Sequence, residues 1–169
     1  MTRLRLPKPF ELLLFWHGLL AGSYTIAYIT AEGAHGLHQF AGYTAVALLA
    51  VRLLVGWRAA GRGAWAFPVP RAAQWRTFAG KLASGNLHVL RGRTPFAPLS
   101  GLVLLSLLVV VAVTGLLADW FGAEDLHEGP AEASLAMVAV HVAIVGLGPA
   151  LKRWGPALAR PSARSAREA

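Results

Sequence analysis

Two histidines in the last third of the chain have a spacing that suggests a binding function. His127 and His141 are fourteen residues apart in the stretch EDLHEGPAEASLAMVAVHVAIVGLG, residues 124–148. Fourteen residues of continuous helix turn through roughly 1400°, about 40° short of four full turns, and rise roughly 21 Å. The two imidazoles would therefore share one helix face at two separate depths. Burying an imidazole among valines is costly unless its ring nitrogens have partners.

Two further histidines complete a pattern of two layers. His17 lies about a third of the way along the first apolar stretch, and His38 begins the second. In four apolar helices that cross a membrane in alternating directions, His38 and His127 form an outer layer. His17 and His141 form an inner layer, so each layer takes its two members from different helices.

Haem is the cofactor that best fits paired histidines in an apolar bundle. Its iron accepts one imidazole on each face of the porphyrin, and a four-helix bundle can hold the ring in its core. We therefore predict two b-type haems, one at each layer. Any one of these histidines alone would more often be a hydrogen-bonded core residue, but ionisable residues inside a membrane are usually functional. The small residues expected against a flat ring are Gly18, Gly22, Gly42 and Gly115.

Other readings of the basic side chains stay open. His35 lies one turn before His38 and could replace it as the outer ligand, whereas His88 is expected to be solvated. Arg52 is expected to extend its charge to the membrane interface, or to contact a haem propionate or a quinone oxygen. A haem-free bundle that moves or senses a transition metal is an alternative, although such a site needs convergent ligands.

The composition indicates which solvent surrounds these side chains. The 169 residues are 56% hydrophobic and 14% charged, with a mean hydropathy of +0.51, whereas soluble domains carry about 25% charged residues. A membrane-spanning helix needs about 20 residues. The absence of cysteine excludes disulfides, iron–sulfur clusters and covalently attached haem. We predict an all-α membrane protein, a four-transmembrane-helix bundle with helices at residues 10–31, 38–57, 98–117 and 130–151.

The charges indicate how these helices are oriented. All sixteen Lys and Arg residues fall on one side of the zigzag: before the first helix, from Arg52 near the inner end of the second helix to Arg93 before the third, and after the fourth. The positive-inside rule then places both termini and the long loop at residues 58–97 in the cytoplasm. The net charge of +8 reflects this topology and attraction to anionic lipid, so no nucleic-acid partner is predicted. The opposite loops carry acids: Glu32, Asp119, Glu124, Asp125, Glu128 and Glu132.

The remaining segments complete the predicted organisation. Residues 1–157 are expected to form one membrane-embedded domain, followed by a flexible tail at 158–169. RAAQWRTFAGKL, residues 71–82, gathers its apolar side chains on one face, which predicts a short amphipathic helix on the membrane surface or else an irregular loop. Because proline is tolerated in a first turn but not in a helix interior, the last helix should begin near Pro130 or kink there.

Three stretches resemble one known family. LHQFAGYTAVALLAVRLLVGW, residues 37–57, looks like the second helix of the prokaryotic cytochrome b561 family. GRTPFAPLSGLVLLSLLVVVAVTGLL, residues 92–117, is similar to its third helix. LHEGPAEASLAMVAVHVAIV, residues 126–145, resembles its fourth helix, with His-Glu followed fourteen residues later by His-Val. The resemblance extends from Phe10 to about Leu151.

The resemblance implies a di-haem membrane cytochrome. Members of the family hold two b haems between paired histidines. The resemblance therefore implies that His17 and His141 bind the iron of the inner haem and that His38 and His127 bind the iron of the outer haem. The implied function is electron transfer between membrane quinone and a periplasmic partner such as a c-type cytochrome, which an acidic outer loop could dock. A haem-carrying anchor subunit of a larger dehydrogenase or hydrogenase is the alternative. No nucleophile or acid–base pair is apparent, and the oligomeric state and a quinone-linked oxidoreductase activity stay open.

Overall fold

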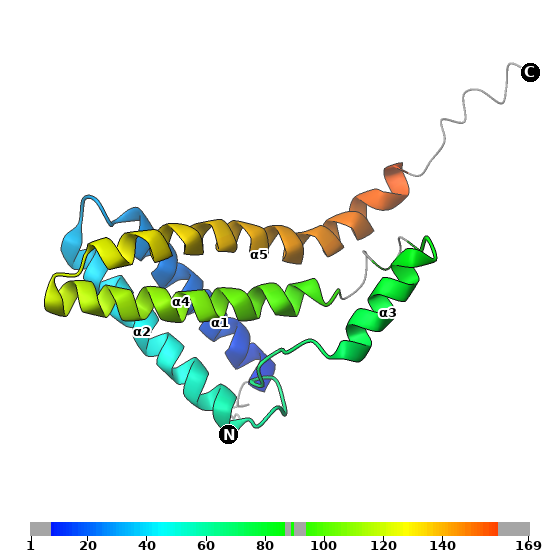
Figure 1. The fold of residues 1–169 in the computed structure, drawn as a ribbon, viewed down its shortest axis with the longest axis horizontal. Helices are drawn as coiled ribbons and strands as arrows, with labels where there is room; N and C mark the ends of the chain where they lie inside the picture. The colour runs from blue at the N-terminus through cyan, green and yellow to red at the C-terminus, as the bar shows by residue number, and fades with distance from the viewer. Residues whose placement is uncertain (1–7, 87–88, 90–93, 159–169) are drawn as a thin grey trace, which may run out of the picture. The chain divides into compact units, whose positions relative to one another are not determined.

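The computed structural model describes residues 8–86, 89 and 94–158, and these residues form helices without a strand. All but one of the helices are long and apolar enough to cross a membrane. The predicted all-α class and the four apolar spans are therefore confirmed, while the orientation of the termini stays a prediction. The helices are α1 (Pro9–Ile29), α2 (His35–Arg58), α3 (Ala72–Ala83), α4 (Phe96–Phe121) and α5 (Asp125–Leu158) (Figure 1).

The chain divides into two compact units, each described here by itself. The first contains Met1–Phe67 and Ser106–Glu132, and the second contains Pro68–Leu105 and Ala133–Ala169. Helices α4 and α5 contribute residues to both units. Apart from Leu158, the predicted flexible tail at 158–169 lies outside the described residues.

Helices α1 and α2 form a hairpin in the first unit (Figure 1). Pro9 begins α1, where its fixed φ suits a helix and its missing N–H removes nothing. Two polar contacts join the helices: the Trp16 indole N–H donates to the Leu48 carbonyl at 2.9 Å, and the His38 ring lies 2.8 Å from the Ala27 carbonyl. Such contacts satisfy polar side chains that lipid cannot.

Both helices that carry an outer-layer histidine begin earlier than predicted. Helix α2 begins at His35 instead of residue 38, and α5 begins at Asp125 instead of residue 130. Carboxylates in the first turn of α5 complement the positive end of its dipole. Pro130 is the sixth helical residue, so its missing N–H removes only one bond near the start of the helix. His127 and His141 therefore lie on one continuous helix.

The long helices carry large apolar side chains on their outer faces. The exposed fraction is 66% for Phe15, 52% for Leu54 and 63% for Val142. In water such a surface would promote aggregation, whereas in a bilayer it faces hydrocarbon chains. The described residues buried within the protein are fewer and include Leu20 and Leu49 of the α1–α2 hairpin.

Helix α3 in the second unit lies in the segment where an amphipathic helix was predicted. The Arg71 backbone N–H donates to the side chain of Gln74 at 2.9 Å at its start. The Phe78 ring is buried against Phe96 with ring centroids 5.4 Å apart, and Trp75 lies 5.1 Å from the same ring. The apolar face of α3 thus packs against the first residue of α4, and its location on the membrane surface stays a prediction.

Candidate histidine cofactor sites

The structure brings together the two histidines predicted for the outer layer. His38 of α2 and His127 of α5 belong to the same unit, and their ring centroids are 6.3 Å apart with the ring planes at 76°. Both side chains are partly buried. The turns between α1 and α2 and between α4 and α5 therefore bring His38 and His127, which are 89 positions apart, into one small site.

Hydrogen bonds fix which ring nitrogen of each histidine carries the hydrogen. His38 Nδ1 lies 2.8 Å from the Ala27 carbonyl, which can only accept, so Nδ1 is the donor. His127 Nδ1 lies 3.1 Å from the Thr114 hydroxyl, which donates its own hydrogen to a carbonyl of the preceding turn. Thr114 therefore accepts from His127. In the neutral form, both rings keep their lone pair on Nε2, as histidines that bind metals typically do.

The distance between the two rings fits one metal ion held between them. A metal–imidazole bond is about 2.1 Å long, and a five-membered ring with bonds of about 1.33 Å has its centroid about 1.1 Å from each atom. Two imidazoles on opposite sides of one iron would then have centroids about 6.4 Å apart. The 6.3 Å between His38 and His127 matches this value. The donor set also matches the bis-imidazole ligation of a b-type haem.

His141 repeats the arrangement of His127 in the second unit. Its ring is partly buried, and its Nδ1 lies 3.0 Å from the hydroxyl of Ser100. That hydroxyl donates to the Ala97 carbonyl at 2.9 Å, so it accepts from the ring. His141 thus also carries its hydrogen on Nδ1.

The other histidines have different surroundings. His17 is exposed on α1, with its ring 6.5 Å from that of Trp16. Because His17 and His141 belong to different units, their pairing stays a prediction. His35 is the exposed first residue of α2, and the ring that faces His127 belongs to His38. His88 lies outside the described residues.

Two pairs of residues on α4 contact the histidines, and only Gly115 among their four members is expected from the sequence. Each pair is a hydroxyl residue followed by glycine, Thr114–Gly115 beside His127 and Ser100–Gly101 beside His141. A Cβ added at Gly115 would lie 3.1 Å from the His127 ring, and one at Gly101 would lie 3.5 Å from the His141 ring. The available signal was the spacing, since the two pairs are fourteen residues apart, like the two histidines. Three other glycines expected near a cofactor have no atom within 4 Å of an added Cβ: Gly18, Gly22 and Gly42.

Comparison with known proteins settles the family. The family model described as prokaryotic cytochrome b561 matches residues 11–156 of the 169-residue chain. The chain belongs to the prokaryotic cytochrome b561 family. No curated protein and no solved structure matches the chain. The resemblance seen in the sequence is thereby confirmed, and membership makes the chain a multi-pass membrane cytochrome of a family that binds haem b and transfers electrons.

The candidate ligands found together in the described residues are a pair of histidines, His38 and His127. A site that binds a bare metal ion usually needs more ligands that converge on one point. Among the residues that the structure describes, no group of three or more His, Asp or Glu side chains is close enough to hold a metal ion. A haem iron takes four of its ligands from the porphyrin, so it needs only two from the protein. The two imidazoles of His38 and His127 are therefore as many protein ligands as a haem iron needs.

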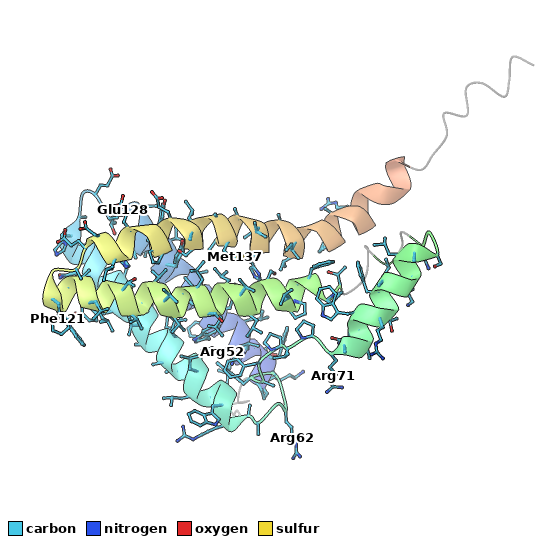
Figure 2. All side chains as sticks on the ribbon, viewed as in Figure 1. Arg52, Arg62, Arg71, Phe121, Glu128 and Met137 are labelled. Carbon is cyan, nitrogen blue, oxygen red and sulfur yellow. The ribbon has the colours of Figure 1, made fainter. Side chains whose placement is uncertain are left out.

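The side chain of Arg52 on α2 is enclosed by other residues of the protein. Its side chain is 5% exposed and donates to the carbonyls of Trp65 at 2.7 Å and Ala66 at 3.3 Å (Figure 2). The guanidinium lies 4.8 Å from the Phe67 ring centroid and 5.8 Å from that of Trp16. The loop after α2 folds back and supplies these acceptors, and the position of the guanidinium relative to the membrane interface stays a prediction. Its contact with a propionate or a quinone stays a prediction.

A polar cluster joins α2 to α4 close to the outer histidine pair. The Asp119 carboxylate accepts hydrogen bonds from the Gln39 amide and the Tyr43 hydroxyl, both at 2.5 Å. The Trp120 indole N–H donates to the same Tyr43 oxygen at 3.0 Å. Because Gln39 follows His38 directly, these bonds help to fix the end of α2 that carries this ligand candidate. The sequence predicts Asp119 in an acidic loop, whereas the residue lies within α4.

Proposed function

We propose that this protein transfers electrons across the bacterial inner membrane through two b-type haems. The observation that carries the proposal is the His38–His127 pair, whose separation and Nδ1 hydrogen bonds suit one iron between two Nε2 atoms. His17 and His141 would bind the second haem. When bound, each haem supplies the one-electron redox chemistry.

The side chains of the protein orient and tune these groups. Acceptors on Nδ1 hold the rings of His38, His127 and His141 in one tautomer and strengthen Nε2 as a donor. The spacing of His127 and His141 separates the two sites by roughly 21 Å along α5, so that one lies near each membrane surface. His38 is favoured over His35 as the outer ligand because its ring is the one beside His127.

We propose membrane quinone and a basic periplasmic c-type cytochrome as the redox partners. The turn between α4 and α5 and the first turns of α5 carry exposed carboxylates that are available for docking, namely those of Glu124, Asp125, Glu128 and Glu132. Asp119 does not belong to this acidic patch, because its carboxylate already binds Gln39 and Tyr43. An acidic patch next to the outer haem would guide a positively charged partner to the site.

Reconstitution of the purified protein in liposomes tests this function. A quinol added to the oxidised protein is expected to produce a reduced b-type α-band, and a basic ferricytochrome c added next should reoxidise it. If quinol leaves the haems oxidised, and reduced haems are not reoxidised by the cytochrome, the assigned partners are wrong. Liposomes without the protein control for direct reduction of the cytochrome by quinol.

Charge reversal in the acidic patch is expected to slow electron transfer to the cytochrome. The double variant Glu128→Lys and Glu132→Lys should lower the second-order rate by about tenfold at low salt, since electrostatic steering raises association rates by at least this factor. The difference should shrink toward 1 M salt, where the Debye length is about 3 Å. Stopped-flow mixing measures the rate, and Glu168→Lys provides a charge change of the same sign and half the size elsewhere. An equal rate for all three proteins at low salt would exclude docking at this patch.

A further inference from the structure

We propose that Thr114–Gly115 and Ser100–Gly101 are two equivalent positioning pairs, whose hydroxyls set the reduction potentials of the two haem sites separately. The inference rests on the proposed function, because it concerns histidines taken to bind iron. It adds the residues of α4 that determine how strongly these histidines donate to the metal.

The two pairs follow one pattern along antiparallel segments. On α4, Thr114 follows Ser100 by fourteen residues, and on α5, His141 follows His127 by the same number. Thr114 contacts His127 within the first unit, and Ser100 contacts His141 within the second. A shift of α4 along α5 by a single residue would break both contacts together, so the match specifies one register.

The hydroxyl groups act as acceptors in both contacts. Thr114 donates its hydrogen to a carbonyl of its own helix at 3.0 or 3.1 Å, and Ser100 donates to Ala97 at 2.9 Å. Each oxygen therefore offers a lone pair to Nδ1–H, at 3.1 Å for His127 and 3.0 Å for His141. Ser100 is only 4% exposed, so no solvent replaces this acceptor if it is removed.

The acceptor affects the metal through the imidazole ring. A hydrogen bond accepted from Nδ1–H raises the basicity of Nε2, which stabilises the oxidised iron and lowers its reduction potential. Removal of the acceptor should therefore raise the potential of the haem concerned. The potential of the outer site would respond to Thr114 and that of the inner site to Ser100, whereas the acceptor for His38 is a backbone carbonyl that substitution cannot delete.

The glycines allow each ring to lie close to the α4 backbone. At Gly115 an added Cβ would be 3.1 Å from His127 Cε1, closer than most contacts of this kind, whereas the corresponding distance at Gly101 is an ordinary 3.5 Å. Each ring is thus held by the hydroxyl of one residue and the bare backbone of the next. The outer pair is the tighter of the two.

Potentiometric titration of the purified full-length protein tests the hydroxyl assignment. Thr114→Val is expected to change the equilibrium constant for reduction of one haem by about threefold in favour of the reduced form. This corresponds to a rise in reduction potential of about 30 mV, at 59 mV per tenfold for one electron. Ser100→Ala should raise the potential of the other haem. Thr114→Ser restores the acceptor and should restore the potential. Thr25→Val removes an exposed hydroxyl with the same bond to its own helix and should change neither haem.

The outcomes separate this inference from the proposed function. A wild-type protein without haem contradicts the function, whatever the variants do. If the wild type binds two haems and both potentials stay unchanged in Thr114→Val and Ser100→Ala, the function stands and the positioning pairs are wrong. Loss of the outer haem from Thr114→Val would support the inference only if Thr114→Ser retains that haem. Equal loss of the outer haem from Thr114→Val and Thr114→Ser would overturn the inference.

The close approach of the His127 ring to Gly115 predicts that Gly115→Ala weakens haem retention more than Gly101→Ala does. Gly115→Ala should displace the His127 ring and weaken retention of the outer haem by about tenfold, the lower end of what displaced supporting contacts cost a metal site. Gly101→Ala should retain the inner haem. Because alanine favours helices more than glycine does, a loss in Gly115→Ala cannot come from helix propensity. Haem transfer to apomyoglobin measures retention, and equal retention in both variants would refute the ranking.

Discussion

Replacement of His127 by alanine is expected to remove one haem and to leave the other in place. The substitution deletes one of the two rings whose centroids lie 6.3 Å apart, so the outer iron would keep a single protein ligand. The second site depends on His141, which lies roughly 21 Å further along α5 and has its own acceptor in Ser100. The pyridine haemochrome assay should report a decrease from about two haems per polypeptide to about one.

The histidines of α2 provide the controls for this experiment. His38→Ala should remove the same haem as His127→Ala, and the double variant should lose no more than either single variant because both side chains serve one site. His35→Ala, three residues away on the same helix, should retain both haems. If His38→Ala and His127→Ala each left one haem but with different potentials and spectra, the two histidines would belong to different sites and the outer pair would be wrong.

Replacement of the buried Arg52 by methionine is expected to destabilise the protein strongly. The variant loses hydrogen bonds from a charged donor to the carbonyls of Trp65 and Ala66, each worth about 1.5–3 kcal/mol. It also loses cation–π contacts worth about 0.5–2 kcal/mol. Relief from burying a charge offsets part of this loss, which leaves about 3 kcal/mol. The melting temperature should fall by roughly 6–12 °C.

Thermal loss of the haem Soret band in detergent measures this stability. Arg58→Met changes an exposed arginine one and a half turns further along α2 and should leave the melting temperature within about 2 °C. Arg52→Lys keeps the charge but not the planar fork that reaches both carbonyls, so its stability should lie between that of the wild type and that of Arg52→Met. Equal melting temperatures for Arg52→Met and Arg58→Met would show that the loop contacts contribute nothing.

Features that depend on helix periodicity could be predicted from the sequence. Four apolar spans follow from composition and length, and a common face for His127 and His141 follows from 3.6 residues per turn. Pro130 predicts a start for α5 at residue 130, whereas the helix begins five residues earlier at Asp125, among acidic residues. A proline within the first two turns removes little, so the carboxylates and not the proline determine where this helix begins.

Apart from the His38–His127 pair, features that depend on contacts between helices could not be predicted. Ser100 and Thr114 look like ordinary hydroxyl residues that bond to their own helix, and their second contact exists only when α4 and α5 adopt one register. The enclosure of Arg52 depends on a connector whose positive φ angles at Gly61 and Gly63 turn it back toward α2. No periodic pattern in the sequence encodes such a turn.

The central claim is that histidines bind two haems in this bundle, and the haem content of the purified wild-type protein tests it most directly. After expression with ample haem supply, we expect about two b-type haems per polypeptide, each bound by two imidazoles. We also expect that simultaneous alanine replacement of His17, His38, His127 and His141 abolishes the pigment. A colourless wild-type protein, or a quadruple variant with undiminished haem, would contradict the account.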